Sequence, residues 1–197
     1  MDFLAHLWLP ILLSAAAVWV AGAIVWMALP HHKGDFARLP DEDGFRAFVR
    51  TSAIPAGSYG FPDFGSHADA NSPEGKKKFA EGPVGTIIVW GKISMGRNML
   101  ITFLVHLVVS ALIGYVGWAA LPHGPPTLGP GGGVAGSTFA HVFQVLGTVG
   151  VLAYSFAFIP NGVWFGQRSR AIVMCILDGV VYGLITGAVF AAMWPTA

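Results

Sequence analysis

The C-terminal stretch AIVMCILDGVVYGLITGAVFAAMWPTA (171–197) contains a single charged residue, Asp178. Three further segments, 3–29, 98–121 and 138–166, contain no Asp, Glu, Lys or Arg at all. Each of the four is longer than the roughly 20 apolar residues that a helix needs to cross a bilayer. In lipid a lone span must satisfy its own backbone polar groups, as a helix does. The sequence therefore predicts an all-α integral membrane protein, a four-helix bundle.

The overall composition agrees with this class. Of the 197 residues, 54% are hydrophobic and only 11% are charged, whereas about a quarter of the residues of soluble domains are charged. We expect spans at about 3–29, 95–121, 138–162 and 170–194, with the lipid bilayer around them. Residues 30–94 should then form a mostly irregular cytoplasmic loop segment between the first two helices. The net charge of +1 gives no reason to expect a nucleic-acid partner.

The basic residues predict the orientation of the bundle. All eleven Lys and Arg lie between the first and second spans or between the third and fourth. The loop 121–138, after the second span, has none, and neither terminus carries a basic side chain. Because Lys and Arg accumulate on the cytoplasmic side, we expect both termini outside, which is the periplasm in a Gram-negative cell.

The sequence predicts few regular elements in the long loop segment. Residues 39–50 place two Phe and one Val on one face of a short helix. Residues 53–75 are rich in Gly, Pro, Ser and Asp, and are expected to be an ordered loop without regular elements. Residues 85–92 fit a short strand or an interfacial approach to the second span. The segment is too poor in apolar residues for a large core, so we expect it to dock on the membrane face or on a partner.

The fourth span has two polar or small stripes on one side. At about 3.6 residues per turn, Asp178 and Tyr182 lie on one stripe, and small residues form the adjoining one. A Gly-x-x-x-Gly spacing lets another backbone approach closely, so this side is expected to face protein. The small residues are Gly179, Gly183 and Gly187.

The carboxylate of Asp178 should not face lipid. Near the bilayer centre that exposure would cost about 2.5–3.5 kcal/mol. We expect Asp178 to hydrogen-bond to Tyr182 or to pair with His106, which lies at a similar depth. A structural hydrogen bond between helices and a role in proton or ion handling both remain open at this point.

A second polar cluster follows the first span. PHHKGDF (30–36) offers His31, His32 and Asp35 as metal-ligand types. Side chains of neighbouring residues are expected to diverge, and no second cluster at ligand spacing is present. The sequence therefore predicts an interfacial polar turn here rather than a metal site.

No cofactor is predicted from the remaining motifs. His6 and His141 share a level near the outer surface, so ligation of haem or chlorophyll by either is an option. GGGVAG (131–136) matches a dinucleotide-binding pattern but lacks the strand and soluble helix that the motif requires. No phosphate loop, nucleophile elbow or metalloprotease motif is present, so nothing indicates an enzyme.

Six stretches together resemble a family of small, uncharacterised bacterial membrane proteins with four spans and no known activity. The resemblance covers most of the chain and implies the four-span fold and a bacterial inner membrane. It implies no cofactor, ligand or site residue. The stretches are HHKGDFARLPDE (31–42), GPVG (82–85), VFQVLGTVGVLAY (142–154), GVWFG (162–166), LDGVVYGLITG (177–187) and MWP (193–195).

Two functions fit these features. The close-packing face and the lack of catalytic motifs favour a non-catalytic accessory or structural subunit that packs within a larger membrane complex, with respiratory and photosynthetic complexes as candidate hosts. Its partners would be other membrane-protein subunits or further copies of this chain. The alternative is a small oligomeric transporter or channel that uses Asp178 for proton or ion handling.

Overall fold

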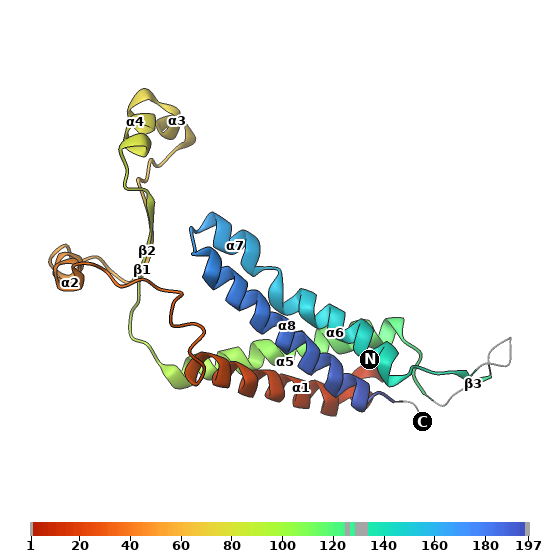
Figure 1. Cartoon of the computed structure of the whole chain (residues 1–197). Helices are drawn as coiled ribbons and strands as arrows, with labels where there is room; N and C mark the ends of the chain where they lie inside the picture. Colours follow the sequence, from red (N-terminus) through yellow and green to blue (C-terminus); the bar gives the residue numbers. More distant parts are fainter. Residues whose placement is uncertain (1, 125–126, 129–133, 196–197) are drawn as a thin grey trace.

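The structure is a computed structural model that describes residues 2–124, 127–128 and 134–195. It is mostly helical, and its long helices lie side by side in a bundle (Figure 1). Within the described residues, four stretches of helix are long and apolar enough to cross a membrane, as the sequence predicts. They are α1 (Asp2–Met27), α5 (Met95–Ala120), α6 (Phe139–Ser155) continued by α7 (Phe158–Trp164), and α8 (Ser169–Ala192).

Two of these helices begin at side-chain caps. The hydroxyl of Ser94 accepts a hydrogen bond from the backbone N–H of Arg97 at the start of α5. Thr138 does the same for His141 at the start of α6. Such caps satisfy backbone donors that have no partner within the helix, and they place both starts within a residue of the predicted ones.

The third stretch runs further than the predicted 138–162. α6 ends at Ser155, and after a short break α7 continues to Trp164. Pro160 is the third residue of α7, within its first turn. A proline there removes no intrahelical hydrogen bond, because those N–H groups have no partner in the helix. Pro160 therefore does not end the helical run.

The closest helix pair of the bundle is α6 and α8, and glycines lie between them. A Cβ atom added at Gly187 would lie 2.6 Å from the Cα atom of Gly147. One added at Gly183 would lie 2.7 Å from the carbonyl carbon of Gly150. Gly179 faces the backbone of Tyr154 in the same way. The predicted small stripe of the fourth span thus lets two backbones pack without intervening side chains.

Helix α1 packs against both α5 and α8. The buried hydroxyls of Ser14 and Ser110 hydrogen-bond to each other, and both lie within hydrogen-bond distance of the carbonyl of Ile11, to which the hydroxyl that does not donate to its neighbour can donate. Buried apolar side chains from all the long helices fill the space around this contact. They include Leu7, Val18, Ile113, Leu146 and Phe190.

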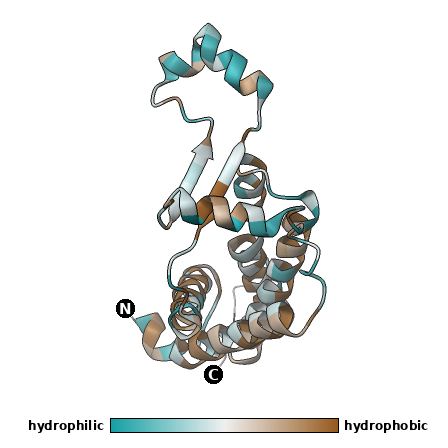
Figure 2. Ribbon diagram, turned by 90° about the vertical axis from the view of Figure 1, so that its left-hand side faces the viewer, coloured by the Kyte–Doolittle hydropathy of each residue, from teal (hydrophilic) through white to brown (hydrophobic). Residues whose placement is uncertain are grey.

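Residues 42–89 form an extension that we call the arm. It begins with α2 (Glu42–Thr51) and contains an antiparallel pair of strands, β1 (Gly57–Phe61) and β2 (Gly85–Val89). The connection between the strands holds α3 (His67–Asn71) and α4 (Pro73–Glu81). Figure 1 shows the arm standing away from the long helices, and Figure 2 shows its far end to be the most hydrophilic part of the fold. A second, short pair, β3 (Thr127–Leu128) with β4 (Val134–Ala135), lies between α5 and α6.

The arm corrects two expectations. Residues 53–75 are not a loop without regular elements, because they contain β1 and α3. The ladder that pairs β1 with β2 uses backbone groups, so a glycine-rich strand can pair with the apolar strand 85–89. The segment 30–94 is consequently less irregular than predicted, whereas the short helix expected within 39–50 and the strand option for 85–92 are confirmed.

Candidate functional site

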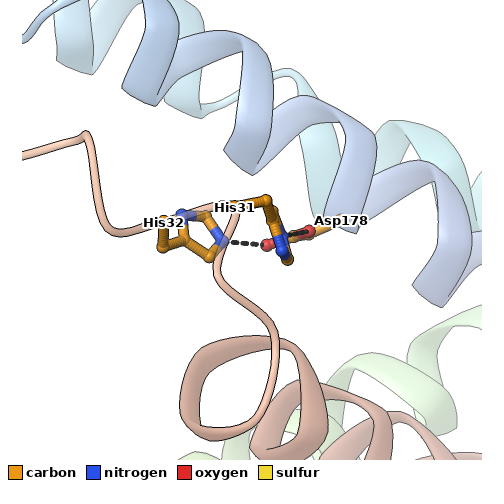
Figure 3. Close-up of side chains that lie close together, drawn as sticks. All are labelled: His31, His32 and Asp178. Atoms are coloured by element: carbon orange, nitrogen blue, oxygen red, sulfur yellow. Dashed lines mark hydrogen bonds and ion pairs between the residues drawn. The ribbon is translucent and has the colours of Figure 1, made fainter.

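The chain turns back on itself directly after α1. Pro30 follows the end of the helix, and two consecutive turns close with hydrogen bonds from Lys33 N–H to the Pro30 carbonyl and from Asp35 N–H to the His32 carbonyl. This geometry presents two adjacent imidazoles to one carboxylate of α8 (Figure 3). The Nε2 atom of His31 lies 3.1 Å from Oδ1 of Asp178, and Nε2 of His32 lies 2.7 Å from Oδ2.

His32 is the centre of this cluster. Its second ring nitrogen, Nδ1, lies 2.5 Å from Oδ2 of Asp35. The indole of Trp26 stacks on the imidazole with ring centroids 3.8 Å apart. The side chains of His32 and Asp178 are only 6% and 9% exposed. Buried polar groups are costly unless they are hydrogen-bonded, and here each finds a partner.

Arginines at the start of α8 hold the turn in place. Arg170 donates from Nη1 to Oδ1 of Asp35 (2.9 Å) and from Nη2 to the carbonyl of His31 (2.7 Å). Arg168 donates to the carbonyl of Gly34 (2.9 Å). A Cβ at Gly34 would lie 2.8 Å from the guanidinium of Arg170, so the close approach favours glycine there. The turn is therefore fixed to α8 at both ends.

The charges determine where the protons lie. A carboxylate can only accept, so that of Asp35 accepts from Arg170 and from Nδ1–H of His32. A neutral His32 would then present the lone pair of Nε2 to an oxygen of Asp178. Burial by itself would lower the pKa of His32, but its hydrogen bonds to Asp35 and Asp178, and their charges, outweigh it and raise the pKa above 6.5. The imidazolium form, which donates from both nitrogens, satisfies both carboxylates.

The cluster also has the composition of a metal-ligand set. One ligand atom each from His31, His32 and Asp178 can be chosen so that all three lie within 4.8 Å of one another. Imidazole nitrogen and carboxylate oxygen together suit first-row transition ions. The arrangement can therefore serve as a buried ion-pair network or as a cation site.

The predicted partner of Asp178 is wrong. Asp178 does turn into protein, but its carboxylate contacts His31 and His32 and not Tyr182 or His106. The ring of His106 instead faces the edges of Tyr154 and Tyr182, with centroids 5.7 and 6.3 Å apart. Tyr182 points towards Gly22 of α1, where a Cβ would lie 3.4 Å from the phenol oxygen.

The expectation that His31 and His32 diverge is also wrong. The two turns after Pro30 tilt the rings by 41° and bring their centroids to 4.3 Å. Sequence reasoning did not place Trp26 or Arg170 at this site. A usable signal was nevertheless present, because the single carboxylate of an otherwise charge-free span needs a polar partner, and the loop after the first span offers two histidines.

The two histidines considered for a pigment lie elsewhere. His6 stacks on Trp118 with ring centroids 5.2 Å apart. His141 lies in the first turn of α6, where its backbone N–H donates to Thr138. Ligation of haem or chlorophyll by either residue stays a prediction.

Comparison of the chain with protein-family models, with curated proteins and with solved structures finds no match.

Proposed function

We propose that the chain spans a bacterial inner membrane four times, with both termini outside, and works as a non-catalytic accessory subunit of a larger membrane complex. In this proposal the arm lies on the cytoplasmic side and docks on a partner subunit. The orientation is supported by the confinement of Lys and Arg to the arm side of the bundle. The resemblance to small four-span bacterial proteins fits the same arrangement.

The uncovered apolar surface of the arm carries the proposal. No residue of α2 is buried, and Phe48 is 59% exposed. On the neighbouring strand, Ile88 is 64% exposed, and Trp90 just after it is 71% exposed. A groove of about 600 Å³ runs between these two elements, with Phe45, Val49 and Ile87 in its lining. Outside a bilayer, a contiguous apolar patch with aromatic side chains is typical of a protein interface.

Charge at the same groove indicates what kind of partner fits. Arg46 and Arg50 of α2 line it beside the apolar residues. Arginine and aromatic residues are enriched in protein interfaces, where arginine binds carboxylates in a bidentate way. We therefore expect a partner surface with an apolar centre and an acidic edge.

The His–Asp–Arg cluster supports a docking role by giving the arm a fixed base. The chain leaves the cluster at Asp35 and enters α2 at Glu42, so few residues separate the arm from its attachment to α8. A fixed base restricts the orientations of the arm and reduces the entropy lost on docking.

The transporter alternative has less support. It requires Asp178 to be available to a moving proton or ion along a pathway. Both oxygens of Asp178 instead contact histidines of the turn after α1, at one end of the bundle. A carboxylate held in this way suits a structural network better than a transport pathway.

Site-specific photo-crosslinking in native membranes tests the docking role. A photoreactive amino acid at Trp90 should crosslink to a different membrane protein, which mass spectrometry of the adduct identifies. The same amino acid at Lys77, which is exposed on α4 away from the groove, serves as the matched control. Crosslinks to the chain itself would indicate a homo-oligomer instead. Crosslinks to lipid alone, at both positions, would contradict a docking role for the arm.

A further inference from the structure

Three residues with ligand-type atoms come together from two distant parts of the chain. Figure 3 shows the ring of His32 beside the carboxylate of Asp178 and the ring of His31 overlapping that carboxylate in this view. The carboxylate oxygens lie 3.1 and 2.7 Å from the two Nε2 atoms. Among the described residues, this set fulfils the requirement that a ligand atom of each residue lies within 4.8 Å of the others.

These separations fit a common ion. Metal–nitrogen and metal–oxygen bonds of about 2.0–2.2 Å place neighbouring ligand atoms about 3.0–3.5 Å apart at tetrahedral or octahedral angles. Both contacts of Asp178 are close to this range. Any separation near the 4.8 Å limit would have to shorten by roughly 1.3–1.8 Å. The ring of His31 can supply that movement, because its side chain is 28% exposed and not packed on all sides.

The groups behind the ligands match those of known metal sites. A metal-bound histidine almost always donates its other ring N–H to a carboxylate, a carbonyl or water. His32 makes this contact through Nδ1 to Asp35, and Arg170 holds the carboxylate of Asp35 in turn. Trp26 stacks on the ring and fixes its plane. The imidazole is thus oriented before any ion binds, with Nε2 directed at Asp178.

The orientation of His32 leaves a defined place for an ion. With Nδ1 on Asp35, the Nε2 atom of His32 is directed at the carboxylate of Asp178, 2.7 Å away. A metal ion bound to Nε2 and to the carboxylate would replace the hydrogen bond between these two groups.

We infer that His31, His32 and Asp178 bind one divalent first-row transition ion, with Asp35 and Arg170 as positioning residues. Zn²⁺ and Fe²⁺ share the required ligand chemistry, since both accept imidazole and carboxylate. Three protein ligands leave positions for water, and the exposed edge of His31 gives the ion access to solvent. The bound ion would clamp the turn after α1 onto α8. This inference is independent of the accessory role proposed above.

Cobalt binding to the full-length protein is the direct test. The protein is purified in detergent through a tag without histidine, stripped with a chelator, and titrated with Co²⁺, whose visible absorption reports its ligands. We expect one Co²⁺ per chain, which Zn²⁺ and, under anaerobic conditions, Fe²⁺ should displace. The ratio of the Zn²⁺ and Fe²⁺ concentrations that displace half of the Co²⁺ shows which ion the site prefers. Loss of the Asp35 carboxylate in Asp35→Asn should weaken binding about 10–100-fold.

His31→Ala decides the result, because it removes a ligand whose ring is partly exposed and should leave the fold intact. We expect it to weaken Co²⁺ binding more than tenfold, whereas His67→Ala, an exposed histidine of α3, should bind as the unchanged protein does. Thermal unfolding with and without Zn²⁺ gives a second readout. Zn²⁺ should stabilise the unchanged protein and His67→Ala, but not His31→Ala. Equal affinity of His31→Ala and the unchanged protein, or no binding by a monodisperse unchanged protein, would overturn the site.

Discussion

Replacing Gly187 by Ala is expected to push α8 away from α6. The new Cβ would lie 2.6 Å from the Cα atom of Gly147, whereas ordinary van der Waals contact begins at 3.4 Å. The two backbones would therefore have to separate by about 0.8 Å, the difference between these distances. Overpacking of this kind costs about 1–3 kcal/mol, and neither atom belongs to a side chain that could rotate away.

Gly147→Ala on the facing helix is the matched control. A Cβ there would lie 3.9 Å from its nearest neighbours, the carbonyl oxygen of Gly183 and the Cα atom of Gly187. Both changes replace an interior helical glycine and gain up to about 1 kcal/mol of helix propensity, so this gain cancels in the comparison. We expect the two variants to differ in stability by about 1–3 kcal/mol, with Gly147→Ala the more stable.

The assay heats the detergent-solubilised variants and measures the monodisperse fraction by size-exclusion chromatography. About 1 kcal/mol shifts the midpoint of a 150–250-residue domain by roughly 2–4 °C. The midpoint of Gly187→Ala should therefore lie about 2–12 °C below that of Gly147→Ala. Equal midpoints, or a lower one for Gly147→Ala, would refute the register of the two helices.

Three further predictions concern the orientation and the His–Asp cluster. In a Cys175→Ala background, a cysteine at Gly136 should react with an impermeant thiol reagent added to whole cells, and one at Lys77 should not; the reverse pattern would mean the opposite orientation. The pKa of His32 is raised above 6.5 in the folded protein. His32 should therefore stabilise the metal-free protein fully below about pH 6.5, and this stabilisation should be lost as the pH rises through the raised pKa. Thermal midpoints measured across pH should show that decline, and His32→Gln should flatten it. Asp178→Asn should keep the helices but cost about 1–3 kcal/mol, since the charge opposite His32 is lost; a cost below about 0.5 kcal/mol would speak against an ion pair.

The four long helices could be predicted because their signal is local. A long run without charged residues predicts an apolar helix by itself, and the segment 98–121 does so without information from any other part of the chain. The inward direction of Asp178 could also be predicted, since a lipid-facing carboxylate is costly wherever its partner lies.

The partner of Asp178 could not be predicted, because it depends on how the chain leaves α1. His32 is separated from Asp178 by 146 positions, and only the two turns after Pro30 bring them together. Neighbouring side chains diverge along a regular strand or helix, and His31 and His32 lie in neither. A search for polar residues at the same depth in the bundle as Asp178 finds His106 instead.

The paired strands of the arm were missed for a different reason. Gly57 and Gly60 are typical of turns and indicate no strand by themselves. Their ladder is specified by the partner strand, which pairs Gly57 with Val89 and Phe61 with Gly85. A non-local pairing of this kind leaves no periodic pattern in the glycine-rich strand.

The contact between His32 and Asp178 also orders events during synthesis. At about 5–20 residues per second, the ribosome needs roughly 7–30 s to make the 146 positions between them. Throughout that interval the turn after α1 has no α8 to hold it, so the arm emerges on an untethered base. The chain acquires the fixed orientation of its arm only when its last helix has been made and packed. Truncated or unfinished chains would therefore carry the apolar surface of the arm without the contact that fixes its orientation.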